Sequence, residues 1–172
     1  MDAPERTLLA KALTAEAFAP FGDVISAATA QESFEINEGG CVRFHDLAHV
    51  EVEGGRAGVS LFRPTPVSPP FRIQKMERHP LGSQAFVPLH HRDYLVVVAP
   101  PGPFDESALT AFHAAGDQGV NYRKGVWHHF LLALHPDTDF LVVDRIGDGD
   151  NLEEVEISDS APIRVGLSGA QL

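Results

Sequence analysis

The feature that most restricts how this chain can fold is the even spread of its chain breakers. Thirteen prolines and fifteen glycines are scattered through 172 residues and do not gather into a linker. The short segments between them are rich in valine, isoleucine, leucine and phenylalanine, a pattern typical of short β-strands joined by turns. This pattern favours an antiparallel sandwich or barrel, formed as a single domain over residues 1–172.

The segments with the strongest β pattern predict eight strands, at residues 42–52, 58–64, 71–80, 84–89, 94–100, 129–134, 139–147 and 153–157. Helical signals are few. Thr14 is a suitable N-cap for a short helix over residues 15–19, which Pro20 would stop. A second helix is predicted from Ser107 to Gly116, with glycine as the residue after its C-cap.

The charge and composition of the chain exclude several classes of partner. A formal net charge of −11 argues against binding nucleic acid or docking on an anionic membrane, since both require a surplus of Lys and Arg. The longest apolar run, residues 95–101, is too short to span a bilayer, and the charged N-terminal segment predicts no secretory signal. The single cysteine, Cys41, excludes an intramolecular disulfide and fits a reducing cytoplasm, and we expect it to be a small buried hydrophobic residue.

Side chains that can bind or titrate concentrate in residues 76–86 and 119–129. Because side chains two apart in a strand share a face, Glu77 and His79 should point the same way and Arg78 the opposite way. A turn after Pro80 would allow a neighbouring antiparallel strand to return Gln84 beside them. A structural alternative treats these charges as a solvated strand edge, but charge between apolar segments is costly unless it is used.

Residues 125–129, GVWHH, contain two adjacent histidines that must face opposite sides of a strand. His128 follows Gly125 in a Gly-x-x-His pattern, which predicts that it faces the interior. His129 and Trp127 would then face outward, toward solvent, a covering loop or another subunit. Trp127 is therefore a candidate for a packing or dimer contact.

The spacing of these groups resembles the two metal-binding motifs of jelly-roll cupins. Glu77-x-His79-x4-Gln84 has the spacing of the first motif with altered chemistry, and Gly125-x-x-His128 has the form of the second. The predicted fold is therefore a mainly β, cupin-like antiparallel barrel or jelly roll with one or two short helices. His79, Gln84 and His128 are candidate ligands for a divalent metal, nickel or another, although glutamine is a poor ligand for borderline ions.

Longer motifs in the same order resemble the ureidoglycolate lyase family from about residue 8 to about residue 155. They are LTAEAFAPFGDVI, RFHDLA, MERHPLGSQAFVPL, LVVVAP, QGVNYRKGVWHH and DFLVVDR. The resemblance implies a cupin-like β-barrel, commonly a homodimer, that splits (S)-ureidoglycolate into glyoxylate and urea in allantoin and purine catabolism. The chain departs from the family at Arg123, where histidine is usual, and at Phe130, where proline is usual.

Such a cleavage needs a base for the substrate hydroxyl and an acid for the departing nitrogen. We expect Glu77 or His79 to be the base and His128 to be the acid or a metal ligand. The substrate carboxylate calls for an arginine, and the candidates are Arg43, Arg63 and Arg78. Arg43 shares a strand face with His45. The predicted substrate-binding set is Arg43, His45, Arg63, Arg78, Gln84 and Asn121, of which Gln84 and Asn121 would orient the ureido group.

Two other functions stay open at this point. One is a metal-dependent cupin-like enzyme that acts on another small hydroxy or ureido acid. The other is a non-catalytic barrel that binds a small ligand.

Overall fold

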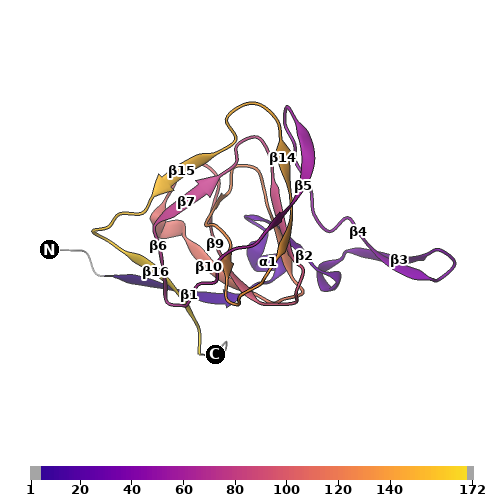
Figure 1. Ribbon diagram of the computed structural model, residues 1–172, viewed down its shortest axis with the longest axis horizontal. Coiled ribbons are helices and arrows are strands. Elements are labelled where there is room, and N and C mark those ends of the chain that lie inside the picture. Colours follow the sequence, from indigo (N-terminus) through magenta and orange to yellow (C-terminus); the bar gives the residue numbers. More distant parts are fainter. Residues whose placement is uncertain (1–4, 170–172) are drawn as a thin grey trace.

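Two curved β-sheets form the body of the molecule, and a two-stranded hairpin projects from it (Figure 1). The computed structural model describes residues 5–169, so the first four residues of the N-terminal segment lie outside the described residues. The described chain is mainly β, with only short helical turns, which confirms the predicted cupin-like fold class. None of the described helices is long and apolar enough to cross a membrane.

The larger sheet has nine strands. In hydrogen-bonded order they are β15 (Glu153–Glu156), β7 (Lys75–Arg78), β12 (Trp127–His128), β9 (Tyr94–Ala99), β10 (Thr110–Ala114), β1 (Arg6–Ala12), β16 (Ile163–Leu167) and β6 (Phe71–Ile73), and β13 (Leu132–Ala133) also pairs with β9. Most pairs are antiparallel as expected, but β1 runs parallel to both of its neighbours, β10 and β16.

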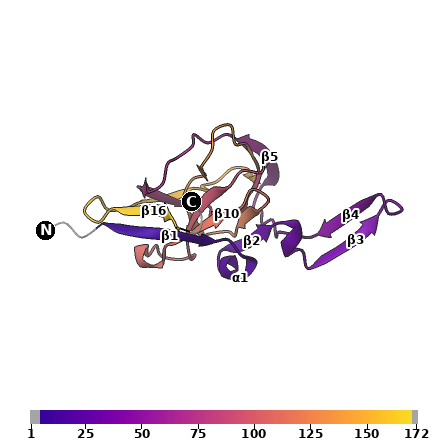
Figure 2. The same ribbon diagram turned by 90° about the horizontal axis from the view of Figure 1, so that it is seen from below.

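The smaller sheet has five strands in the order β2 (Gly22–Ile25), β11 (Gly119–Tyr122), β8 (Gln84–Pro88), β14 (Phe140–Ile146) and β5 (Arg56–Phe62). All of its pairs are antiparallel. The hairpin consists of β3 (Glu32–Ile36) and β4 (Cys41–His45), and it extends well away from the sheets (Figure 2). Cys41 lies exposed at the start of β4, so the expectation that it is buried was wrong, because β4 belongs to the projecting hairpin.

Strand β9 is the centre of the packing, and all six of its residues are buried. Tyr94, Val96 and Val98 point into the core between the two sheets. Leu95 and Val97 point into a second core on the other side of the nine-stranded sheet. A strand covered on both faces reads as a continuous apolar run and does not alternate, which explains the sequence LVVVA.

Helix α1 (Ala15–Phe18) confirms the first predicted helix, and the Thr14 hydroxyl caps it by accepting a hydrogen bond from Ala17 N at 3.1 Å. The second predicted helix was wrong. Only a 3-10 turn, η2 (Glu106–Ala108), forms there, and residues 110–114 become β10; the other 3-10 turn is η1 (Ala27–Thr29). Ala111 and Phe112 enter opposite cores, so tertiary packing overrides the local helical preference.

Five predicted strands, residues 58–64, 84–89, 94–100, 139–147 and 153–157, are confirmed with small changes at their ends. The range 71–80 divides into β6 and β7, and the range 42–52 is strand only as far as His45. The range 129–134 was wrong over its first three residues, because β12 ends at His128 and β13 begins at Leu132.

Candidate functional site

Glu77, His79 and His128 come together near the β15 end of the nine-stranded sheet, where it faces β8 of the five-stranded sheet. Glu77 on β7 lies directly opposite His128 on β12 in the antiparallel register, and His79 follows the end of β7. Glu77 Oε1 lies 4.0 Å from His79 Nε2 and 3.9 Å from His128 Nδ1. The carboxylate thus stands between two imidazoles, outside direct hydrogen-bond distance of either.

Strand alternation places these side chains as the sequence predicted. Arg78 points to the opposite face, where its guanidinium lies 4.5 Å from the Trp127 ring centroid and pairs with Glu153. Trp127 is buried and donates its indole N–H to the carbonyl oxygen of Gly102 at 2.9 Å. Its predicted role as a packing contact is therefore confirmed.

The histidine doublet divides between the two faces of the sheet. The His128 ring stacks on Tyr122 with centroids 4.3 Å apart and planes 5° apart, and His128 is buried, as predicted. His129 faces the other side and is also buried, with its ring edge-on to Phe71 of β6. A covering segment of the same chain therefore shields His129 from solvent.

Burial sets the protonation of His128. Desolvation, reinforced by nearby His79, lowers the pKa of His128 to about 3, so its imidazole is neutral near pH 7. Nδ1 lies 3.3 Å from the His129 carbonyl oxygen, whereas Nε2 is buried with no hydrogen-bond partner among the described residues. A buried nitrogen without a partner is uncommon in folded proteins and marks this atom as a candidate for binding a ligand.

The pKa of Glu77 shifts in the opposite direction from that of His128. Burial raises the pKa of its carboxyl group above the ordinary value, and the neighbouring charge of His79 partly opposes this shift. A carboxylate with a raised pKa is a stronger base than an exposed one. It is therefore better suited to take a proton near neutral pH.

Gln84 returns beside His79, as the predicted turn required. His79 Nε2 lies 3.1 Å from Gln84 Oε1, and His79 Nδ1 lies 2.7 Å from the carbonyl oxygen of Asn151. Gln84 Nε2 donates to Asp144 Oδ2 at 3.1 Å. Both ring nitrogens of His79 are thus held by neighbouring groups of the same chain.

The remaining predicted binding residues lie elsewhere in the described chain. Arg43 and His45 are on the hairpin, where the Arg43 guanidinium lies 5.9 Å from the Phe34 ring centroid. Arg63 forms a two-bond ion pair with Asp139. Asn121 points to the outer face of the five-stranded sheet and donates to Asp23 Oδ2 and the His49 carbonyl oxygen.

Three contributors to the site were missed by the sequence analysis: Tyr122, Asp144 and Asn151. Asp144 did carry a signal, because it is a carboxylate within the apolar strand FLVVDR at a position that alternation directs inward. Tyr122 alternates with Val120 and so also faces inward. Asn151 acts through its main-chain oxygen, which no side-chain pattern reveals.

A divalent metal at this site would need the same donors. One ligand atom each from Glu77, His79 and His128 lies within 4.8 Å of the others, so these residues are close enough to share a divalent ion. However, Asn151 and Gln84 oxygens occupy the two nitrogens of His79, and the Gln84 oxygen is itself engaged. A metal needs a free nitrogen lone pair, so the donors as arranged do not fit one, and no catalytic step is routed through a metal.

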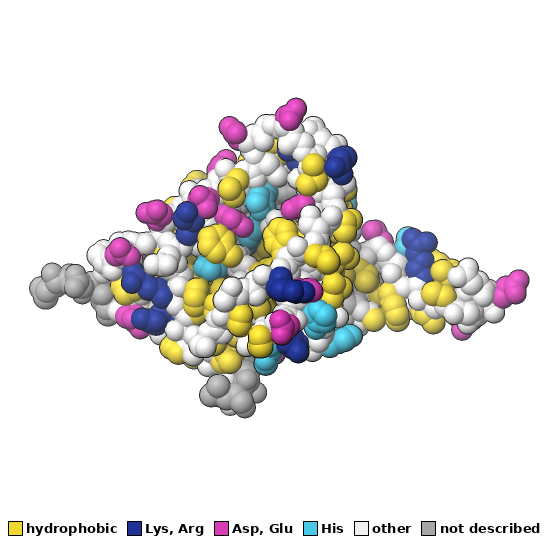
Figure 3. All heavy atoms as spheres, in the orientation of Figure 1, with side chains coloured by type: hydrophobic (Ala, Val, Ile, Leu, Met, Phe, Trp, Pro, Cys, Tyr) yellow, Lys and Arg dark blue, Asp and Glu magenta, His cyan; other side chains and the backbone are white. Residues whose placement is uncertain are grey.

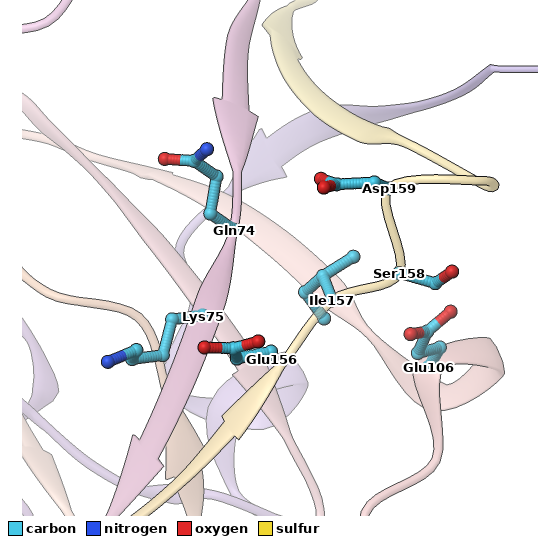
Figure 4. A pocket seen from close by; sticks show the side chains of 7 residues that line it. All are labelled: Gln74, Lys75, Glu106, Glu156, Ile157, Ser158 and Asp159. Carbon is cyan, nitrogen blue, oxygen red and sulfur yellow. The ribbon is translucent and has the colours of Figure 1, made fainter.

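A prominent surface hollow lies away from this cluster. A surface cavity of about 490 Å³ lies where the β6–β7 junction meets η2 and the segment after β15 (Figure 4). Its lining includes the carboxylates of Glu106, Glu156 and Asp159. A cavity rich in carboxylates is a poor binding site for a small anion, and the buried histidine cluster is the stronger candidate.

Comparison with known proteins gives a consistent result. The family model described as ureidoglycolate lyase matches residues 5–165. A protein named ureidoglycolate lyase from Burkholderia mallei (strain NCTC 10229) is 56% identical over 157 residues, which cover 90% of this chain and 92% of the relative. Proteins with the same name from Brucella melitensis biotype 2 and Brucella ovis are 54% and 53% identical with the same coverage.

Proposed function

This chain belongs to the ureidoglycolate lyase family and is an enzyme that cleaves ureidoglycolate, and we propose that Glu77 and His79 carry the proton transfers that release glyoxylate and urea. This role is supported by the surroundings of Glu77: its carboxylate lies about equally far from two imidazoles, and burial raises its pKa. The two alternative functions considered above are not favoured by the similarities. We also propose that the enzyme serves allantoin and purine catabolism in the cytoplasm.

The reaction needs no nucleophile and consumes no water. One carbon of the substrate bears a carboxylate, a hydroxyl group and a ureido nitrogen. In the proposed mechanism Glu77 takes the hydroxyl proton, the C–O bond becomes a carbonyl as the C–N bond breaks, and the departing nitrogen receives a proton from His79. The products are glyoxylate and urea, and the proton on Glu77 returns to His79 between turnovers.

We propose a role for His128 that differs from the two expected from the sequence, general acid or metal ligand. An imidazole with a pKa of about 3 carries no spare proton near neutral pH and is a poor general acid. Its unpartnered Nε2 is instead suited to accept a hydrogen bond from the substrate hydroxyl or ureido group. We therefore assign His128 to orientation of the substrate beside Glu77.

A glyoxylate assay tests this function directly. The wild-type protein should release glyoxylate and urea from (S)-ureidoglycolate in equal amounts. Glu77→Gln should lower kcat by roughly 10²-fold or more, because an amide cannot take the proton. Release of ammonia without urea, or an unchanged rate in the variant, would refute the proposed chemistry.

We propose that the enzyme is a homodimer, and the outer face of the five-stranded sheet supports this. Leu61, Leu141 and Val87 form one outward row across β5, β14 and β8, and Val59 and Val143 begin a second. Val59 and Leu61 are 69% and 65% exposed. A sheet packed on one face normally has a polar second face, so two apolar rows indicate a covering partner.

The projecting hairpin also has exposed apolar side chains. Val42 and Phe44 are exposed on one face of the hairpin and Phe34 on the other, and hydrophobic side chains are visible both there and over the β5 flank (Figure 3). A two-stranded hairpin is marginally stable alone in water. A two-fold dimer would cover the hairpin and the sheet of both copies at once. Sedimentation should therefore give a dimer, and Leu61→Glu with Val59→Glu should shift it toward monomer.

Recognition of the substrate carboxylate follows from the same dimer. Arg63 and Arg78 are engaged by carboxylates in their own chain, whereas Arg43 forms no ion pair among the described residues. We propose that the projecting hairpin brings Arg43 and His45 to the partner subunit's substrate, with Gln84 completing the polar surroundings, whereas Asn121 on the outer face of the five-stranded sheet lies away from this site. If subunits of Glu77→Gln and Arg43→Ala protein are mixed in equal amounts and exchange, half of the dimers are mixed, and each mixed dimer has one intact site out of two. The mixture should therefore regain roughly a quarter of wild-type activity. Activity no higher than that of the parents would exclude this arrangement.

A further inference from the structure

A chain of polar contacts runs from β14 to the loop after it and passes through the candidate acid. Asp144 Oδ2 accepts from Gln84 Nε2 at 3.1 Å, Gln84 Oε1 lies 3.1 Å from His79 Nε2, and His79 Nδ1 lies 2.7 Å from the Asn151 carbonyl oxygen. Gln84 and Asp144 stand directly opposite each other in the β8–β14 register. The amide is therefore anchored by two neighbouring strands, and Gln84 itself is only 6% exposed.

The direction of each hydrogen bond follows from its end groups. A carboxylate accepts and does not donate, so Asp144 requires the NH2 group of Gln84 on its side. The amide oxygen of Gln84 must then face His79 Nε2, and an oxygen can only accept. The main-chain oxygen of Asn151 likewise accepts from Nδ1. His79 thus has an acceptor at both ring nitrogens, and each nitrogen satisfies its contact only by carrying a hydrogen.

Asp144 occupies an unusual place for a carboxylate. The inward-facing neighbours on its strand, Phe140 and Val142, are fully buried in the core between the sheets. A charge next to such a core is costly unless a specific contact uses it. Asp144 contacts Gln84, and this hydrogen bond explains why a carboxylate stands at this inward-facing position.

We infer that Asp144 is a positioning residue, which orients the Gln84 amide so that Nε2 of His79 carries a hydrogen and donates it to Gln84 Oε1. Nε2 is the same nitrogen that lies 4.0 Å from Glu77 Oε1. The orientation rests on geometry alone; its consequence for catalysis, that His79 is the acid, rests on the proposed function. It also explains why His79 offers no lone pair to a metal.

The test is the ¹⁵N NMR signature of the His79 ring in metal-free protein near neutral pH. In the wild type we expect a protonated Nε2 signal at His79. In Asp144→Asn we expect that signal to move toward the unprotonated position, because an asparagine can meet either end of the Gln84 amide and removes its bias. The matched control is Asp139→Asn, a carboxylate immediately before β14, which contacts Arg63 and not Gln84.

Kinetics give a second readout. Asp144→Asn should lower kcat by roughly tenfold with KM little changed, because Asp144 acts on the acid and does not touch substrate. An unprotonated Nε2 at His79 in the wild type, no change in Asp144→Asn, or a shift of the His79 signal on adding Ni²⁺ would overturn the inference. If the variant fails to fold, the wild-type spectrum still shows whether Nε2 of His79 carries a hydrogen, and an unprotonated Nε2 overturns the inference. A protein with the expected spectrum but no glyoxylate release would refute the proposed function and leave the inference standing.

Discussion

Two clusters in this protein contain the same groups, one carboxylate and two histidines, but arrange them differently. In the Asp93 cluster, the two carboxylate oxygens lie 2.6 Å from His113 Nε2 and 2.6 Å from His135 Nε2. In the Glu77 cluster, the nearest nitrogens of His79 and His128 are 4.0 and 3.9 Å away. The first cluster is closed by its own hydrogen bonds, whereas the second leaves a gap.

The pKa shifts of the two carboxyl groups follow this difference. Burial works against ionisation of Asp93, yet the hydrogen bonds from His113 and His135 outweigh it and lower its pKa. Burial dominates at Glu77 and raises its pKa. A satisfied carboxylate ties strands and loops together, whereas an unsatisfied one between two imidazoles retains the capacity to take a proton from a ligand.

The largest expected difference between the clusters is in catalysis. Glu77→Gln should reduce kcat by roughly 10²-fold or more, whereas Asp93→Asn should stay within about twofold of wild type. Both substitutions replace a carboxylate with an amide of similar shape, so each is the control for the other. Glyoxylate release under saturating substrate measures both, and a comparable loss in Asp93→Asn would remove the distinction.

The pH dependence of stability sharpens the comparison through His128. The folded pKa of His128, about 3, lies below the unfolded value of about 6.5. Between these values the unfolded state binds a proton and the folded state does not, so the free energy of unfolding is highest above pH 6.5 and decreases as the pH falls toward 3. Between about pH 7 and about pH 4, His128 should lower the free energy of unfolding by on the order of 3 kcal/mol, at about 1.4 kcal/mol per pH unit between the two pKa values. Urea unfolding of wild type and His128→Gln should show a smaller pH dependence in the variant. Parallel curves would contradict a neutral buried imidazole.

Stability at neutral pH should depend on the Asp93 cluster. Asp93→Asn removes one acceptor oxygen and the charge that assists both hydrogen bonds, which should lower the free energy of unfolding by about 1–2 kcal/mol. Because the folded pKa of Asp93 is depressed, this stabilisation is present above the unfolded pKa and is lost as the pH falls through the folded value. The loss in the variant should therefore shrink in acid. Urea titrations at neutral and acidic pH measure it.

The smallest expected effect concerns the exposed member of the Asp93 cluster. The His135 side chain is 48% exposed and that of His113 is 19% exposed. His135→Gln should thus cost about 0.5 kcal/mol or less, and His113→Gln more, because water replaces the lost contact of an exposed group. Thermal unfolding of the two variants compares them, and a reversed order would mean that burial does not rank these contacts.

The sequence was informative where local rules apply and misleading where they compete with packing. Alternation placed Glu77 and His79 on one face, Arg78 on the other and His128 inside, since strand geometry fixes these directions. The Ala-rich segment at 107–116 indicated a helix, but pairing with β9 and β1 made half of it, residues 110–114, a strand with buried residues on both faces. The roles assigned to the site residues stay predictions.

Read alone, the sequence determined the fold class, the return of Gln84 beside His79 and the opposite directions of the two histidines at 128 and 129. These follow from short-range rules of strand geometry and turns. Only the tertiary structure decided that His129 is covered by Phe71, that Arg43 stands on a projecting hairpin, and that Asp144 anchors Gln84. Those facts depend on contacts between residues far apart in the chain, and no local pattern specifies which distant strands pair or what the pairing leaves uncovered.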